Sequence, residues 1–223
     1  MAVGPTLAGS RLRRLARHEA PAAGGASPQP PAPVEDEVCE LCGVAVPPEH
    51  RHLLDLDKRD LLCACRACSL LFDGDAAGGG HYKLVPDRRL SLDDFQLDDV
   101  TWERLSIPVE MAFFFRNSRE GRVMAYYPSP AGPTESLLGL EAWADIETAN
   151  PVLATMADDT EALLVNHAKG ARRHWLVPIE DCYALVGLIR MRWRGFSGGA
   201  EVWEEIDRFF DELDAKSASS RRE

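Results

Sequence analysis

The chain has 223 residues, a net charge of −11 and a hydrophobic fraction of 45%. This length suits one medium domain or a small domain followed by a larger one, and the apolar content predicts a packed core. The acidic charge argues against a nucleic-acid partner, because binding phosphates requires clustered Lys and Arg, and it suits a basic protein partner instead.

Long apolar stretches are missing from the sequence. No run approaches the roughly 18 apolar residues that a membrane-spanning helix needs. No apolar region follows the basic residues near the N-terminus, as a secretory signal would require. We therefore expect a cytoplasmic protein with no membrane span. In that reducing compartment, paired cysteines are more often metal ligands than disulfides.

In chain order, residues 1–34 come first and have the composition of a tail. A short arginine-rich stretch is followed by residues 20–33, which are almost entirely Ala, Pro, Gly and Ser and cannot bury a core. A disordered basic and Pro/Ala-rich tail is predicted, with a basic docking segment for a partner as the alternative. Residues 217–223 are expected to form a second disordered tail.

Residues 35–90 contain every cysteine of the chain except Cys182. The segment contains two C-x-x-C pairs, Cys39 with Cys42 and Cys65 with Cys68. Two such pairs supply the four thiolates of a closed tetrahedral zinc site. The residues between the pairs are typical of two strands around a turn at 58–60. We therefore expect a small zinc-ribbon-like β-hairpin segment in which these four cysteines bind zinc.

Several alternatives stay open within this segment. Cys63 would face the same side of a strand as Cys65, so it could replace Cys65 as a ligand or be a buried thiol that behaves as a small apolar residue. His50 and His52 are reserve ligands or exposed hairpin residues. Iron fits four thiolates as well as zinc does and would make the segment rubredoxin-like. The apolar run at 70–72 is expected to pack beneath the metal.

Residues 91–216 are expected to form an α+β domain with antiparallel hairpins and C-terminal helices. Aromatic-rich runs at 109–116 and 122–127 flank a Gly-containing turn, which is typical of a β-hairpin. A second strand pair is expected at 161–166 and 174–177. Helices are expected within 92–105, with Ser91 as the N-cap, and at 140–149, 179–192 and 200–214.

Residues that could carry catalysis are few. Cys182 with His167 or His174 could form a Cys–His pair. However, Cys182 falls on an apolar helix, where a core thiol is the ordinary case, and His174 falls on an expected strand. No nucleotide-binding loop, serine triad or HExxH helix is present in the sequence. We therefore expect no catalysis and assign no catalytic residue, and an enzyme site in residues 91–216 stays open as a third alternative.

Several motifs together resemble a bacterial family of unknown function. They are CELCG, EHRHLLDL and LLCACRACSLLF, then WERLSIPVEMAFFF, HWLVPIEDCYALVGLIR and WRGFSGGAEVWEEIDRFF. The similarity runs from the SRLRRLAR segment to Leu213, which is nearly the whole chain. Genes of that family lie in clusters that encode uptake NiFe hydrogenases and their accessory proteins. The resemblance therefore implies a hydrogenase-linked role, with hydrogenase subunits or maturation factors as partners.

Two functions follow as expectations. The first is a non-catalytic zinc-binding accessory or interaction protein that is linked to NiFe hydrogenase assembly or stability. The alternative is a rubredoxin-like iron module that transfers electrons to or from a hydrogenase. Bound iron with a reversible reduction would favour the second expectation over the first.

Overall fold

The computed structural model describes residues 37–74, 77–136, 140–195 and 197–219. Their contacts form two compact units that divide between Leu84 and Val85. The tail expected at residues 1–34 lies outside the described residues, as does the end of the chain from residue 220. The domain limits expected from the sequence stay predictions.

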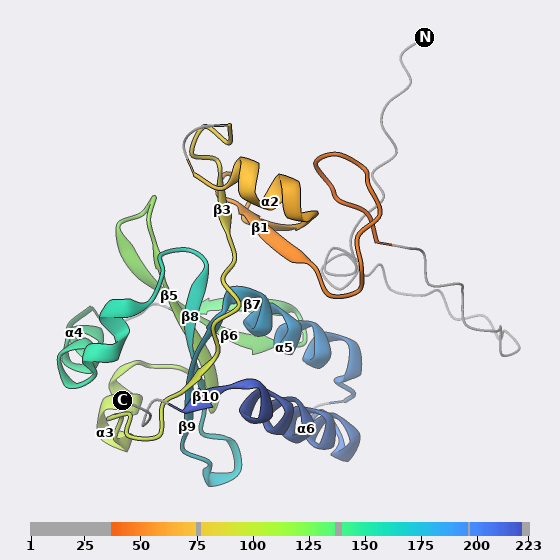
Figure 1. Ribbon diagram of the computed structural model, residues 1–223. Coiled ribbons are helices and arrows are strands. Elements are labelled where there is room, and N and C mark those ends of the chain that lie inside the picture. The colour runs from red at the N-terminus through yellow and green to blue at the C-terminus, as the bar shows by residue number, and fades with distance from the viewer. Residues whose placement is uncertain (1–36, 75–76, 137–139, 196, 220–223) are drawn as a thin grey trace, which may run out of the picture. The chain divides into compact units, whose positions relative to one another are not determined.

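The unit of residues 37–84 is built on a small antiparallel sheet. Its strands are β1 (Arg51–Asp55), β2 (Asp60–Ala64) and β3 (Tyr82–Leu84), in the order β2-β1-β3. β1 and β2 form the expected hairpin. Asp55 stabilises its turn, because one carboxylate oxygen accepts hydrogen bonds from the amides of Asp57 and Lys58, both at 3.0 Å. Helix α2 (Arg66–Phe72) follows β2 directly, and Figure 1 shows α2 between β1 and β3 along the chain.

Helix α2 differs from what the sequence suggested. We expected the run at 70–72 to pack beneath the metal, but Leu70 and Leu71 are 68% and 57% exposed. Phe72 alone of the three packs against the small core around the cysteines. The reason is helical geometry, since successive residues point about 100° apart and three in a row cannot share one buried face.

The unit of residues 85–219 is α+β. In the described part of the chain its sheet has seven strands in the order β10-β4-β9-β8-β5-β6-β7, and every neighbouring pair is antiparallel except β10 with β4. The strands are β4 (Leu90–Ser91), β5 (Met111–Asn117), β6 (Arg122–Ser129), β7 (Gly132–Ser136), β8 (Glu161–Asn166), β9 (Arg173–Pro178) and β10 (Ala218–Ser219).

Helices cover both faces of this sheet (Figure 1). They are α3 (Asp99–Arg104), α4 (Leu140–Ala149), α5 (Ile179–Arg192) and α6 (Ala200–Lys216), with short 3-10 turns η1 (Pro151–Thr155) and η2 (Ala168–Gly170). Neighbouring residues of β5 show the two faces. Phe114 stacks on Trp143 of α4, whereas Phe113 contacts Tyr183 of α5 edge-on. Because both faces are covered, the central strands are apolar without alternation.

Most elements of this unit were predicted correctly, and α3 lies within the expected range 92–105, but the expected N-cap of that helix is wrong. Ser91 does not cap a helix. It lies in β4, where it is the partner of Trp175, and Leu90 is the partner of Leu176. The helix begins at Asp99, and Asp98 is its N-cap, accepting a hydrogen bond from the amide of Thr101 at 2.7 Å. Pairing with β9, far along the chain, therefore decided the conformation of Ser91.

None of the helices in the described residues is both long and apolar enough to span a bilayer.

Candidate metal centre

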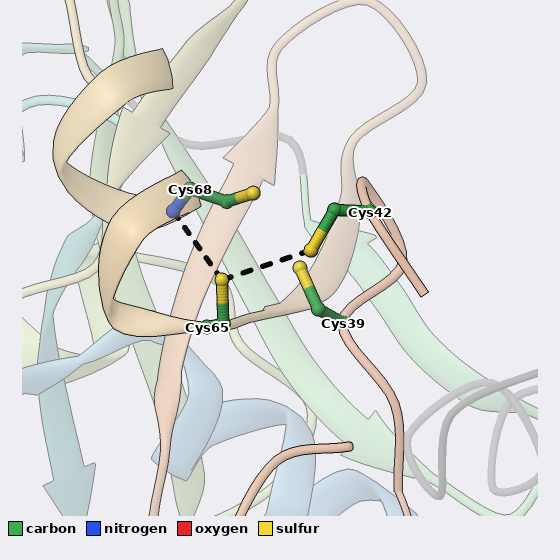
Figure 2. A group of neighbouring side chains, drawn as sticks. All are labelled: Cys39, Cys42, Cys65 and Cys68. Carbon is green, nitrogen blue, oxygen red and sulfur yellow. Dashed lines mark hydrogen bonds between the residues drawn. The ribbon is translucent and has the colours of Figure 1, made fainter. Parts of the chain in front are cut away.

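The first cysteine pair lies in a tight loop ahead of the hairpin. The Cys39 amide donates to the Val44 carbonyl and the Gly43 amide donates to the Cys39 carbonyl, both at 2.8 Å. Gly43 has φ +77°, a conformation that side chains other than glycine adopt only with strain. An isolated bridge between Val38 and Ala45 closes the loop. The turn thereby holds the thiols of Cys39 and Cys42 on the same side of the loop (Figure 2).

The second pair lies at the start of helix α2. Cys65 is the N-cap residue, and its sulfur accepts a hydrogen bond from the Cys68 amide at 3.4 Å. One turn of helix places Cys68 beside Cys65, because residues three apart in a helix lie on the same face. The order along the chain is therefore a tight loop with two cysteines (a knuckle), the hairpin of β1 and β2, and helix α2. A zinc ribbon would have a second tight knuckle at this position, so the finer fold expected from the sequence is not confirmed.

Glu40 joins the two halves of the centre. Its amide donates to the Cys63 carbonyl at 2.9 Å, and its carboxylate accepts from the Cys63 amide at 2.9 Å. The loop with the first pair is thus held against the end of β2, immediately before the second pair. The sequence analysis missed this role, and the position of Glu40 between Cys39 and Cys42 was the only signal for it.

The four sulfur atoms converge. We call Cys39, Cys42, Cys65 and Cys68 the four-cysteine cluster. Their sulfur atoms all lie within 4.8 Å of one another, and Figure 2 shows them turned toward a common space. The Cys42 and Cys65 sulfurs are 3.8 Å apart. A disulfide bond is about 2.05 Å long, whereas a tetrahedron with metal–sulfur bonds of about 2.3 Å has edges of about 3.8 Å. The cluster could therefore hold a metal ion.

Burial differs among these cysteines. Cys39 and Cys68 are buried together with Val46 in a small apolar core, and Leu41 and Phe72 pack against it. Cys65 is half-buried and Cys42 is exposed. One edge of the cluster therefore faces solvent while the opposite edge is enclosed by apolar side chains.

The pKa values of the thiols reflect burial, nearby amides and the closeness of the other sulfur atoms. Burial raises the pKa of Cys39, but backbone amides, that of Cys65 foremost, outweigh it and lower the pKa to about 7. Burial and the neighbouring thiols raise the pKa of Cys68. For Cys42 the Val44 amide acts to lower the pKa, but the nearby sulfurs raise it overall. Four thiolates so close repel one another, and a bound cation removes that repulsion.

The other candidate ligands lie elsewhere. Cys63 is not part of the four-cysteine cluster; its sulfur lies within 4.8 Å of ligand atoms of His50 and His52. Cys63 is 2% exposed, and both histidines are half-buried as whole residues. The two reserve ligands and the alternative ligand thus form a group of their own.

The residues of the possible Cys–His pair lie in the unit of residues 85–219. His167 and His174 are buried side by side, with their Nε2 atoms 3.0 Å apart. Aromatic rings cover the pair, since Trp102 lies against His167 and Phe95 stacks on His174. Cys182 is fully buried on α5, and burial raises the pKa of its thiol. This thiol is placed as a core residue.

Comparison with known proteins gives one match. The model described as "Family of unknown function (DUF5947)" matches residues 38–217, a span that includes the four-cysteine cluster and most of both units. No curated protein and no solved structure matches the chain.

Proposed function

Since the chain belongs to the DUF5947 family of unknown function, we propose its role from the candidate metal centre. It is a non-catalytic zinc-binding accessory or interaction protein, with the four-cysteine cluster as its zinc ligands. The observation that carries this proposal is the convergence of four sulfur atoms, with one pair at the edge length of a tetrahedral tetrathiolate site.

A structural role for the metal fits the small size of its surroundings. Four thiolates fill the coordination of Zn²⁺ and leave no position for a substrate or a water nucleophile. The apolar core next to the cluster is formed by few residues, so metal binding would supply much of the folding free energy of this region. Zinc would then act here as a cross-link between the first loop and helix α2.

Exposed apolar side chains near the centre support an interaction role. Leu70 and Leu71 on α2 and Val44 in the first loop are each more than half exposed. Leu70 also lines a cavity of about 490 Å³ together with apolar residues such as Val46 and Leu84. Apolar surface of this kind on a folded protein is typical of a site that contacts another protein. The metal would hold this surface in shape.

The hydrogenase link rests on the sequence resemblance alone. We propose that the protein acts in the cytoplasm and assists the assembly or stability of a NiFe hydrogenase. Deleting the gene in its host should lower hydrogen uptake, and the wild-type gene should restore it. A Leu70→Glu variant that still binds zinc should restore less. Unchanged maturation and activity in the deletion strain would contradict this part of the proposal while leaving the zinc site untouched.

The zinc assignment has a direct test. Protein purified under reducing conditions should contain zinc, measured by mass spectrometry, and should be colourless. Cys68→Ser should lower the zinc content, whereas Cys182→Ser changes a cysteine outside the centre and serves as the matched control. An equal zinc content in both variants would argue against the four-cysteine cluster as the site.

The exposure of Cys42 favours one alternative. A rubredoxin-like iron site transfers electrons through a ligand at the surface, and Cys42 is the exposed member of the cluster. In this alternative the protein passes electrons to or from the hydrogenase. Purified protein would then be coloured, would contain iron, and would show a visible absorption that disappears on reduction and returns on oxidation.

A further inference from the structure

A second group of metal-ligating side chains lies on the hairpin of the unit of residues 37–84. It consists of His50, His52 and Cys63, whose ligand atoms lie within 4.8 Å of one another. The hairpin places them together. His52 on β1 and Cys63 on β2 are direct partners in the antiparallel pair, and side chains of direct partners lie on the same face. His50 comes just before β1, and the centroid of its ring lies 4.7 Å from that of His52.

His50 shows why this group is more than a chance grouping. Its side chain is 5% exposed. Nδ1 lies 2.8 Å from the Pro47 carbonyl oxygen. Because a carbonyl oxygen only accepts, Nδ1 carries the proton and donates it. Nε2 of the neutral ring is then an acceptor, and it is buried with no hydrogen-bond partner among the described residues. Such a buried, unsatisfied atom destabilises the fold unless something binds it.

A metal ion bound to Nε2 of His50 would satisfy this nitrogen. Histidines that bind metals through Nε2 usually donate Nδ1–H to a carbonyl or carboxylate, which fixes the tautomer and the ring orientation. The Pro47 carbonyl does this for His50, and the Glu37 carboxylate lies 3.7 Å from the same Nδ1. With Nδ1 turned to the Pro47 carbonyl, Nε2 is the nitrogen left for a ligand.

We propose that His50, His52 and Cys63 form a second metal site, separate from the four-cysteine cluster, for a divalent ion of the zinc class. Two imidazoles and one thiolate match the mixed nitrogen and sulfur preference of such ions. Three protein ligands leave a fourth position for water or for a donor from another molecule. In this respect the site differs from the closed four-cysteine site, and it goes beyond the function proposed above.

Cobalt titration of the full chain tests the proposal. The metal-free, reduced protein should bind two equivalents of Co²⁺, one with the absorption of a tetrathiolate site and one with weaker sulfur-to-metal bands. His52→Gln and His50→Gln should each bind one equivalent and keep the tetrathiolate spectrum. Cys42→Ser should lose the tetrathiolate spectrum. His81→Gln is the matched control, because His81 is exposed on the same unit and pairs with Asp57.

The retained tetrathiolate spectrum also shows that each histidine variant is folded, so a loss of the second equivalent cannot be ascribed to unfolding. A wild-type protein that binds one equivalent of Co²⁺ would overturn the proposal. So would histidine variants that still bind two equivalents. Neither result would touch the zinc site of the four-cysteine cluster, which the Cys42→Ser variant tests by itself.

Discussion

Replacing Glu40 should weaken metal binding although Glu40 is not one of the proposed ligands. Its carboxylate accepts a hydrogen bond from the Cys63 amide at 2.9 Å, and this bond holds the first cysteine loop against the end of β2. In Glu40→Ala the amide of Cys63, a buried residue, loses its acceptor, which costs about 1–2 kcal/mol. The metal needs both cysteine pairs in place, so this free energy is lost from the binding reaction.

The size of the effect follows from that free energy. At about 1.4 kcal/mol for each tenfold change in affinity, Glu40→Ala should bind Zn²⁺ about 5- to 30-fold more weakly than wild type. Glu40→Gln should lose less, because the amide side chain keeps an oxygen that can accept. Competition with a chromophoric zinc chelator in reducing buffer measures both affinities.

A charge control separates the hydrogen bond from simple electrostatics. Glu49 is an exposed acidic residue of the same unit, so Glu49→Ala removes the same charge without removing the bond to Cys63. It should bind zinc within about twofold of wild type, because exposed charges are screened by water and salt. If Glu40→Ala matches wild type, or if Glu49→Ala loses as much affinity, the proposed role of Glu40 is wrong.

Three further predictions concern stability. Chelating the metal should unfold residues 37–84 and leave 85–219 folded, so limited proteolysis should cut only the first unit; cuts throughout both would contradict this. Burial and His167 lower the pKa of His174 to about 3. In the unfolded chain the pKa of His174 is near 6.5, so as the pH falls the unfolded state binds the proton before the folded state does. The contribution of neutral His174 to stability is complete above about pH 6.5 and is lost as the pH falls toward 3, at up to about 1.4 kcal/mol per pH unit. His174→Gln should flatten the dependence of the unfolding free energy on pH, measured by urea unfolding. Phe114→Ala, at a fully buried position stacked on Trp143, should destabilise the second unit by about 3–5 kcal/mol in urea, whereas exposed Val100→Ala should change it by less than about 0.5.

Local signals in the sequence were sufficient for much of the fold. The helix at 179–192 and the helix at 140–149 have the expected limits, because apolar spacing and the Asn150-Pro151 stop act within a few residues. The hairpin of β5 and β6 follows from aromatic runs around Gly121, which has φ +62°. The pairing of two C-x-x-C motifs likewise needed only their spacing.

The failures have a common physical cause, which is contact between residues distant in the sequence. Ser91 has the chemistry of an N-cap, but pairing with β9 made it part of a strand. The sequence left Cys63 open between an alternative ligand and a buried thiol, and it did not show that the cross-strand partner of Cys63 is His52. The grouping of Cys63 with two histidines could be found only once the register of β1 and β2 was known. Glu40 likewise gains its role only when the loop docks on β2.

The order of pairing in the two sheets sets when each unit can form during translation. The strands and proposed ligands of the first unit come from neighbouring stretches of chain, so that unit can be complete soon after Leu84 leaves the ribosome. The second sheet differs, because β4 must wait for β9, which begins about 80 residues later, and for β10 at Ala218–Ser219, near the end of the chain. If the four-cysteine cluster binds metal as proposed, the first unit can therefore take up its metal before the large sheet is complete.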